Sequence, residues 1–172
     1  MNLIITCPRN LEDQTIDEID TLLDQFGDTS AKISKTEFSG IIEITTSLEI
    51  SQVVDNIREK INEEPWLIRF CSRIIPIQKE CKSNLESIKE EVERMITCIE
   101  KHESYRITIE KRNSQIKSKD IISQVAGLIS NKVSLENPDW EIIIQVLGNL
   151  TGISILPKNS ILSVSKEKRL ES

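Results

Sequence analysis

The chain has 172 residues, of which 38% are hydrophobic and 29% are charged, and its formal net charge is −6. This length suits one ordinary domain or two small packed domains, and the composition is typical of a folded protein rather than a disordered one. No apolar run approaches the roughly 20 residues of a membrane-spanning helix, and the N-terminus M-N-L-I-I-T-C-P lacks the basic start and apolar core of a signal peptide. We therefore expect a cytoplasmic protein that does not associate with a membrane.

The charge is distributed unevenly along the chain. Residues 1–64 carry 5 basic and 14 acidic side chains, a net charge of −9, whereas residues 65–172 carry 17 basic and 14 acidic side chains, a net charge of +3. An acidic chain argues against general nucleic-acid binding, but here the acidity is confined to the first third. The remainder can still present a positive surface to phosphate groups.

Residues 1–77 begin with a strand and an amphipathic helix. We expect a short strand at residues 3–5, followed by a helix over residues 11–26 whose apolar side chains recur at helical spacing. Asn10 is a suitable N-cap for this helix, and Gly27 a suitable terminator.

Two more strands and a second helix complete this first region. Strands are predicted at residues 31–37 and 41–46, then a helix over residues 50–63. Pro65 breaks the helical pattern, and residues 67–77 read as a final strand. The order β-α-β-β-α-β predicts an α+β protein whose N-terminal domain is ferredoxin-like.

A second α/β unit is predicted over residues 78–165. Ser83 and Glu86 have the spacing of a capping box ahead of an amphipathic helix. Residues 105–109 alternate between apolar and polar side chains, as in a half-buried strand, and a second helix follows over residues 118–129.

The end of this unit carries turn signals and another strand. N-P-D at residues 137–139 is expected to shape a turn, because Pro138 fixes φ and its neighbours can satisfy local backbone groups. A strand over residues 140–146 follows, with one or two short strands after it. Residues 166–172, K-E-K-R-L-E-S, are predicted to form a loose tail.

The sequence contains few residues or motifs that are typical of a catalytic site. The chain has one histidine, His102, and four cysteines that form no C-x-x-C pair, so a zinc site is not expected. A disulfide between Cys71 and Cys81 is conceivable, but it would be unusual in a reducing cytosol. No glycine-rich nucleotide-binding motif occurs among the five glycines. We therefore expect a protein that is not an enzyme and that uses no metal or cofactor.

Basic residues gather between the strand at residues 105–109 and the helix that follows it. They lie near the predicted helix start, where free N–H groups and a partial positive charge favour a phosphate. An ordinary surface, with Ser118 as the N-cap and lysines that aid solubility, is the alternative. Few aromatic residues are available for base stacking, so recognition of phosphates and helix shape is favoured over base reading. The predicted RNA-binding residues are Arg106, Lys111, Arg112, Lys117, Ser118, Lys119 and Lys132.

The sequence resembles THUMP domains over roughly residues 80–165. The resemblance rests on the strand ending in K-R, the serine-led helix, K-V-S-L-E-N-P-D, the apolar strand W-E-I-I-I-Q-V and the later G-I-S. It departs from the family pattern at Ser134 and Gln145, where acidic residues are usual. The resemblance implies an RNA-binding module of tRNA-modifying systems that docks on the tRNA acceptor stem and its 3′ end.

A finer resemblance involves the first half of the chain. N-L-I-I-T, S-G-I-I-E-I, E-P-W-L-I-R and R-I-I-P-I are similar to stand-alone THUMP proteins that assist tRNA cytidine acetylation. Those proteins carry no catalytic domain. The resemblance therefore implies a tRNA-binding adaptor that helps a separate tRNA cytidine acetyltransferase to form N4-acetylcytidine in the D-arm.

Two other functions are compatible with the sequence. The chain could be the RNA-binding portion of a THUMP-containing methyltransferase or thiolation enzyme without its catalytic domain, although K-E-K-R-L-E-S has the appearance of a natural end. It could also be a protein-interaction module without RNA, whose acidic first third meets a basic partner. The length of the reading frame tests the first alternative, and tRNA binding at low salt tests the second.

Overall fold

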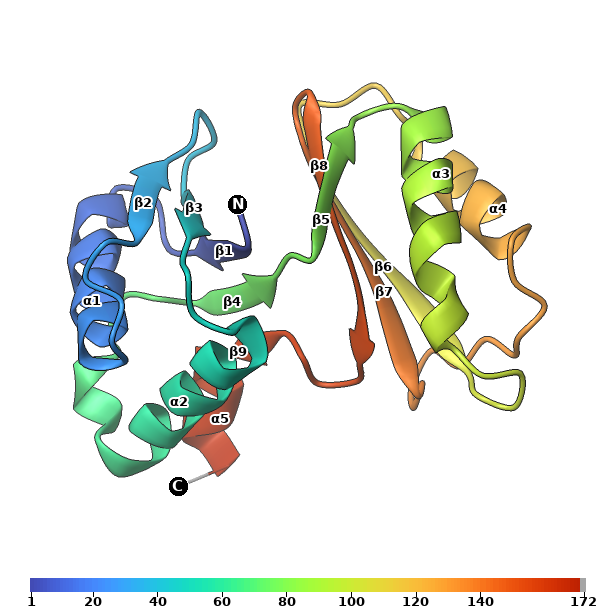
Figure 1. Cartoon of the computed structure of the whole chain (residues 1–172). Coiled ribbons are helices and arrows are strands. Elements are labelled where there is room, and N and C mark those ends of the chain that lie inside the picture. The colour runs from blue at the N-terminus through green and yellow to red at the C-terminus, as the bar shows by residue number, and fades with distance from the viewer. Residues whose placement is uncertain (171–172) are drawn as a thin grey trace. The chain divides into compact units, whose positions relative to one another are not determined.

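The computed structural model describes residues 1–170, and the chain forms two compact units (Figure 1). The first unit comprises Met1–Pro76 together with the residues from Asn159 on, and the second is Ile77–Lys158. Each unit has its own sheet, so the fold is α+β, as predicted.

The first unit is built on an antiparallel sheet with the strand order β2-β3-β1-β4-β9. Its central strand β1 pairs with β3 on one side and with β4 on the other. The strands are β1 (Leu3–Thr6), β2 (Lys32–Lys35), β3 (Ile41–Thr45), β4 (Arg73–Pro76) and β9 (Leu162–Ser163).

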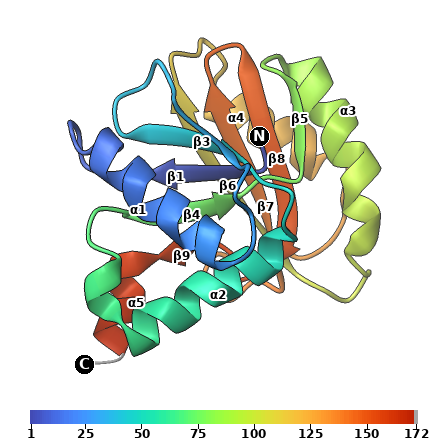
Figure 2. The same ribbon diagram turned by 60° about the vertical axis from the view of Figure 1, so that its left-hand side comes forward.

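Two helices cover one face of this sheet, α1 (Glu12–Gln25) and α2 (Ile50–Glu63) (Figure 2). Together with the strands up to β4, they give the predicted ferredoxin-like order β-α-β-β-α-β. The apolar sides of both helices and alternate strand residues form one core. Its fully buried members include Leu3, Ile44, Ile57, Ile61 and Ile74.

The start of α1 differs from the prediction. The N-cap is Leu11, and no side chain caps the helix. Asn10 instead has a φ of +69°, a left-handed conformation that asparagine tolerates better than most residues. Asn10 therefore turns the chain into α1 and does not cap it.

The carboxylate of Asp28 is buried just after α1. It accepts hydrogen bonds from the Thr46 hydroxyl at 2.5 Å, from the Ser47 N–H at 3.0 Å and from the Ser30 N–H at 3.0 Å. These bonds favour the charged form and lower the pKa of Asp28 to about 2 from its ordinary value of 3.8. Asp28 thereby ties the end of α1 to the chain that follows β3.

We expect Asp28→Asn to change how the stability of the protein depends on pH. A folded-state pKa below the unfolded one contributes stability that is fully present above pH 4 and is lost as the pH falls towards 2. The variant should be less stable at pH 7 and should lose less stability over that acid range, as measured by urea unfolding at pH 7, 4 and 2.5. Asp20→Asn, at an exposed position, is the control. Equal acid sensitivity of the wild type and Asp28→Asn would contradict this account.

The second unit has a four-stranded sheet with the order β5-β8-β7-β6. Strands β6 and β7 are parallel, and the other neighbours are antiparallel. The strands are β5 (Lys79–Lys82), β6 (Tyr105–Arg112), β7 (Trp140–Leu147) and β8 (Leu150–Pro157).

Helices α3 (Leu85–Met95) and α4 (Ser118–Ala126) pack on one face of this second sheet (Figure 1). The predicted capping box of α3 is wrong. Asn84 is the N-cap and accepts a hydrogen bond from the Ser87 N–H at 2.8 Å, whereas the Ser83 hydroxyl bonds that of Thr151 at 2.8 Å.

The C-terminal segment also departs from the prediction. Residues from Asn159 on belong to the first unit, and Val164–Leu170 forms helix α5. This helix is held by Lys168, whose Nζ donates to the Ile68 carbonyl at 2.6 Å, and by Glu167, whose carboxylate lies 3.2 Å from Nε of Arg58. The prediction of a loose tail is therefore wrong for residues 166–170, and residues 171–172 lie outside the described part of the chain.

No helix within residues 1–170 is both long and apolar enough to cross a bilayer.

Two short 3-10 helices complete the described elements, η1 (Pro65–Leu67) and η2 (Ile96–Cys98). The first of these lies where a strand from residue 67 was predicted, so β4 begins six residues later than expected.

Candidate nucleic-acid interface

The chain turns sharply between β6 and α4, and basic residues stand on both sides of the turn. Strand β6 ends at Arg112, whose carbonyl accepts a hydrogen bond from the Gly148 N–H at 2.9 Å. Asn113 then has a φ of +51°, and the Ser114 hydroxyl accepts from the Ile116 N–H at 3.2 Å. We call Lys111, Arg112, Lys117, Ser118 and Lys119 the β6–α4 cluster.

The side chain of Lys111 stabilises this turn. It lies on the same face of the sheet as the helices, because it follows Ile107 and Ile109 at a spacing of two residues and both of these pack against the core. Its Nζ donates to the Ile116 carbonyl at 2.7 Å. One of its three N–H donors is therefore used to hold the loop.

The start of α4 is open to a ligand. Lys117 is the N-cap, no side chain caps the helix, and both Lys117 and Lys119 are exposed. The predicted helix start at Ser118 is confirmed, and the alternative in which Ser118 is the N-cap is wrong, since Ser118 is the first residue of α4. Uncapped N–H groups and two ammonium groups at one helix end form a favourable environment for a phosphate.

Arg106 is engaged within the second unit. Its guanidinium donates to the Glu141 carboxylate at 2.7 Å and to the Leu135 carbonyl at 2.7 Å. The Glu141 side chain is only 8% exposed and also accepts from the Thr108 hydroxyl at 3.2 Å. Arg106 thus neutralises a buried carboxylate on the neighbouring strand, which is a structural role in its own right.

We expect Arg106→Gln to destabilise the second unit. Removing one partner of a buried ion pair costs about 3–5 kcal/mol, and because the Arg106 side chain is 31% exposed we expect a loss of about 2 kcal/mol in the free energy of unfolding. Urea denaturation measures it, and adding Glu141→Gln should recover part of the loss by removing the unpaired charge. A variant of unchanged stability with much weaker tRNA binding would instead show that Arg106 acts mainly on RNA.

Lys132 lies at the other end of β6. Its carbonyl accepts from the Tyr105 N–H at 3.0 Å, where β6 begins, whereas the β6–α4 cluster starts where β6 ends. The six residue steps from Tyr105 to Lys111 span about 20 Å in an extended strand. Five of the seven predicted residues therefore lie between the end of β6 and the start of α4, with Arg112 on the opposite face of the strand from Lys111, and Arg106 and Lys132 lie at the other end of β6.

The N-P-D segment lies in a loop whose backbone bends at Asn137 and Asp139. Pro138 is buried, and the Asp139 carboxylate accepts from the Ser104 N–H at 2.8 Å and the Ser104 hydroxyl at 3.1 Å. These bonds lower the pKa of Asp139. Asn137 accepts from Nζ of Lys158 at 2.5 Å, so this loop is tied to the chain on two sides.

The positive charge of the second unit is local. Residues 77–158 carry 12 basic and 12 acidic side chains, so the unit as a whole is neutral. Helix α3 alone carries four glutamates, whereas both exposed lysines at the start of α4 belong to the β6–α4 cluster. A phosphate would therefore be attracted to that cluster and not to the unit as a whole.

The described residues give little evidence for metal binding or for cysteine chemistry. Residues 1–170 contain no group of three or more His, Cys, Asp or Glu side chains that could hold a metal ion. All four cysteines are free thiols, so Cys71 and Cys81 form no disulfide. Burial, with a smaller contribution from Glu91, raises the pKa of Cys81 to about 11, which keeps it protonated at neutral pH.

The second unit is an α/β layer with a basic strand-to-helix turn. Residues 82–156 match the family model of the THUMP domain, so the chain contains a THUMP domain. The β6–α4 cluster lies inside the matched range. The predicted THUMP boundaries of 78–165 extend beyond the match on both sides.

The chain is also similar to proteins known from sequence and from crystal structures. An uncharacterized protein of Methanocaldococcus jannaschii, MJ0421, is 24% identical over 174 residues, which cover 98% of this chain and 44% of that protein. The structure of PH1313 from Pyrococcus horikoshii Ot3 has a TM-score of 0.68 and 18% identity, and the match covers 91% of this chain and 55% of that one. A possible methylase from Clostridium difficile 630 has a TM-score of 0.58 and 17% identity, over 93% of this chain and 42% of that one.

These likenesses establish the fold. At 18% and 17% identity they do not carry a specific activity across. The chain spans about half the length, or less, of each of these proteins.

Proposed function

We propose that this chain is a non-catalytic, cytoplasmic tRNA-binding adaptor that assists a separate cytidine acetyltransferase in forming N4-acetylcytidine in the tRNA D-arm. The observation that carries the RNA-binding part is the THUMP domain with an uncapped, lysine-flanked helix start. The adaptor part is supported by the sequence motifs of the first half, N-L-I-I-T, S-G-I-I-E-I and E-P-W-L-I-R.

The acceptor stem and 3′ end of tRNA are the proposed contact. A local basic cluster in a chain with few aromatic side chains fits backbone phosphates of a helix better than unstacked bases. Gel-shift titration should therefore show that a minihelix of the acceptor stem with its 3′ end binds nearly as well as whole tRNA. Binding of whole tRNA without binding of the minihelix would contradict the acceptor-stem contact.

The acetylation role needs its own experiment. The chain should raise the rate of N4-acetylcytidine formation when added to tRNA and the acetyltransferase of the same source, and should form none by itself. Mass spectrometry of the digested tRNA measures the product. No increase over the acetyltransferase alone would contradict the adaptor role.

A second candidate is the RNA-binding portion of a larger modification enzyme. It is favoured by the similarity to a possible methylase of which this chain covers only 42%. Under this alternative, tRNA binding would persist and the acetyltransferase would be unaffected, so the two experiments above separate the candidates.

A further inference from the structure

Strand β2 is an edge of the sheet in the first unit. The order β2-β3-β1-β4-β9 places β3 on one side of β2 and, within the described residues, no strand on the other. Just after β2, the Thr36 N–H donates to the Ile41 carbonyl of β3 at 3.2 Å, and the backbone groups of successive residues in such a pair point to opposite sides. Ile33 and Lys35 therefore direct their N–H and C=O groups outwards. Within residues 1–170 these groups form no hydrogen bond.

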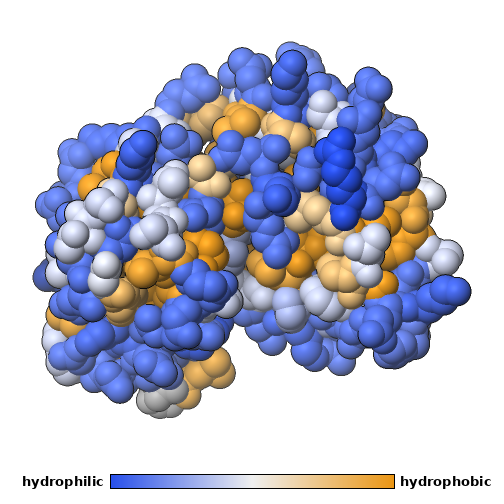
Figure 3. Space-filling model, in the orientation of Figure 1, coloured by the Kyte–Doolittle hydropathy of each residue, from blue (hydrophilic) through white to orange (hydrophobic). Residues whose placement is uncertain are grey.

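An open edge of this kind can accept a further strand, because each outward N–H and C=O group then gains a partner. The edge is accessible, since Lys32, Ser34 and Lys35 are all exposed. On the face of the molecule drawn in Figure 3, hydrophilic residues dominate and apolar residues come to the surface in separate patches. Backbone pairing and charge, rather than a large apolar area, therefore decide what this edge binds.

Helix α1 runs along the same edge and turns an acidic side towards it. The carboxylate of Asp13, at the start of α1, lies 2.7 Å from Nζ of Lys35, at the end of β2. The end of α1 leads directly into the start of β2 through residues 26–31, so the helix and the strand are antiparallel neighbours. Three more aspartates follow Asp13 at spacings of four, three and four residues, which places them on the same side of the helix: Asp17, Asp20 and Asp24.

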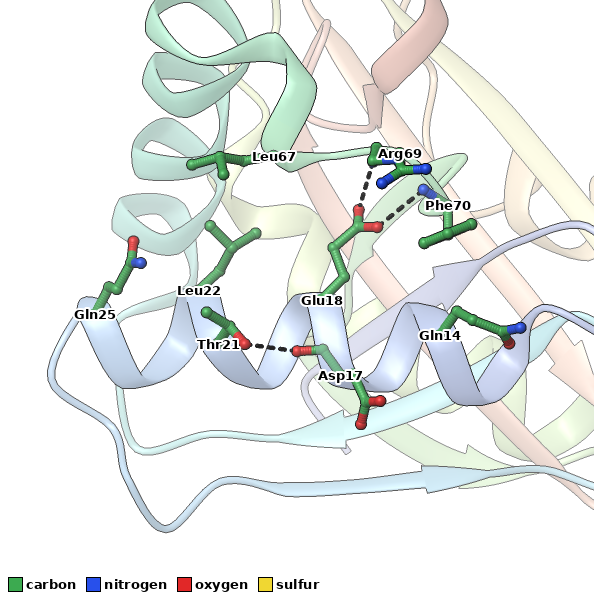
Figure 4. Close-up of a pocket in the computed structure, with 9 residues that line it drawn as sticks. All are labelled: Gln14, Asp17, Glu18, Thr21, Leu22, Gln25, Leu67, Arg69 and Phe70. Atoms are coloured by element: carbon green, nitrogen blue, oxygen red, sulfur yellow. Dashed lines mark hydrogen bonds between the residues drawn. The ribbon is translucent and has the colours of Figure 1, made fainter.

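Another side of α1 faces the segment that follows η1 (Figure 4). There the Glu18 carboxylate accepts hydrogen bonds from the backbone N–H groups of Arg69 at 3.1 Å and Phe70 at 2.9 Å. Asp17 borders the pocket drawn in this view, but its side chain points away from Arg69 and Phe70. The two sides of α1 are therefore distinct, and the acidic one belongs to the β2 edge.

The negative charge of this side is not balanced within the described residues. All four aspartates are exposed, α1 contains no basic residue, and only Asp13 forms an ion pair. Like charges four residues apart repel each other, and Asp24 stands near the helix C-terminus, where the helix dipole disfavours a negative charge. Cations beside β2 would relieve both effects, whereas RNA phosphates would be repelled.

The lysines of β2 do not cancel this charge. Lys35 is neutralised by Asp13. Lys32 points to the other face of the sheet, because it precedes Ile33, whose side chain packs against the core on the helix face. The helix side of the edge is therefore negative.

A second copy of this chain does not fit the edge. Two β2 strands paired about a two-fold axis would place both α1 helices on the same face of the joined sheet, with their acidic sides towards each other. Like charges brought together in this way oppose association. A strand from another protein, with cations on the side that faces α1, meets opposite charge instead.

We infer that the outer edge of β2 binds an extended basic segment of a protein partner, which adds a strand to this sheet. Lysine or arginine side chains on alternate residues of that segment face Asp17, Asp20 and Asp24. Three such cations, at positions i, i+2 and i+4, span about 13 Å, and the helix from Asp17 to Asp24 spans about 10 Å. The inference deepens the adaptor proposal and rests on it for the existence of a partner, because it names the surface by which the adaptor meets its enzyme.

The first test uses a defined peptide as the probe. A fluorescent nine-residue peptide in which lysine alternates with threonine is titrated with the full chain at 100 mM salt, beside a peptide of the same composition whose lysines form one block. We expect the alternating peptide to bind at least fivefold more tightly. Equal binding of the two peptides would overturn the inference, since it would show charge attraction alone.

N-methylated peptides test the pairing through the backbone. One version of the alternating peptide carries N-methyl groups on three lysines, and the other carries them on three threonines. Only one of these sets of amides can face β2, because the direction of the N–H groups alternates along a strand. One version should therefore bind at least tenfold more weakly than the parent peptide, and the other should stay within threefold. Equal effects of the two methylation patterns would rule out strand addition.

A pair of variants at one position locates the edge. Lys35→Pro removes an outward N–H group and places a ring at the edge, whereas Lys35→Ala loses the same side chain and keeps the N–H group. We expect Lys35→Pro to bind the alternating peptide at least tenfold more weakly than Lys35→Ala. Circular dichroism checks that both variants fold. Equal binding by the two variants would contradict pairing at β2.

Charge variants locate the acidic side. Asp20→Lys with Asp24→Lys should weaken binding of the alternating peptide at least tenfold. Glu59→Lys with Glu63→Lys on α2 has the same spacing and the same charge change at exposed positions, and should stay within threefold of the wild type. An equal loss in the α2 control would overturn the assignment to α1.

The Lys35→Pro variant also separates this inference from the proposed RNA function. Its tRNA binding should stay within twofold of the wild type, because β2 lies outside the residues that match the THUMP domain. If tRNA binds and the alternating peptide does not, the inference fails while the RNA-binding function stands. If the peptide binds and tRNA does not, the RNA-binding function fails while the assignment of the β2 edge stands.

Discussion

Replacing Lys117 and Lys119 together by glutamate is expected to weaken tRNA binding about thirtyfold at 100 mM salt and to reduce the slope of log affinity against log salt by about 2. Both lysines are exposed at the uncapped start of α4, and their side chains form no hydrogen bond or ion pair within residues 1–170, so their replacement removes phosphate contacts without disturbing the loop. Reversal of Lys111 and Arg112 should also weaken binding, but Lys111 braces the loop through the Ile116 carbonyl, so that variant mixes two effects. Gel-shift titration over a salt series measures both quantities.

The matched control is Lys89→Glu with Lys101→Glu. Both residues are exposed in the same unit, outside the β6–α4 cluster, and the net charge changes by the same amount. This control should keep its affinity within about threefold, because screening limits the reach of a surface charge to roughly 10 Å at this salt concentration. Equal weakening by the two pairs would mean that tRNA senses the charge of the whole protein and not this loop.

Gly40→Ala is expected to lower the free energy of unfolding by about 3 kcal/mol, from left-handed backbone strain together with a clash. Gly40 has a φ of +75°, and an added Cβ would lie 2.5 Å from the Cys7 carbonyl oxygen. The backbone cannot move away easily, because the Cys7 N–H donates to the Gly40 carbonyl at 2.9 Å and the Gly40 N–H donates to the Glu12 carboxylate at 2.6 Å. Urea denaturation measures the loss.

Gly27→Ala isolates the effect of the clash. Gly27 has a φ of +105°, but nothing lies within 4 Å of an added Cβ, so only the conformational strain of about 1–2 kcal/mol applies. A loss at Gly40 no larger than that at Gly27 would show that the close approach to Cys7 relaxes freely.

Elements with a complete local pattern were predictable from the sequence. The predicted helix over residues 50–63 coincides with α2, because Val53, Val54, Ile57 and Ile61 repeat at helical spacing and Pro65 stops the pattern. The strand at 140–146 was predicted to within one residue, since a long apolar run between N-P-D and a glycine leaves little choice.

Elements that depend on distant partners were not predictable. Strand β5 is K-E-C-K, three charged residues out of four, and it forms only because Lys79 pairs with Ile153 and the rest of the strand follows along β8. Helix α5 is similar, since its contacts to Arg58 and Ile68 are about 100 residues away in sequence. Nothing local in either segment signals these pairings.

Part of the candidate site could be predicted from the sequence. A strand end followed closely by a helix start places Lys111, Arg112, Lys117 and Lys119 together whatever the rest of the fold does. The ion pair of Arg106 with Glu141 was not predictable, because it depends on the parallel register of β6 and β7 that places the two residues opposite each other. One signal could have found it: Glu141 is the one charged residue within the apolar run W-E-I-I-I-Q-V, and a buried carboxylate needs a cation.

The most direct test of the central claim is the affinity of the wild-type chain for tRNA between 50 and 300 mM salt. With four cations in the β6–α4 cluster, the account predicts micromolar binding at low salt that falls with a slope of about −3 to −4 in log affinity against log salt. Absence of binding at 50 mM salt, or binding that does not change with salt, would contradict phosphate recognition by this THUMP domain.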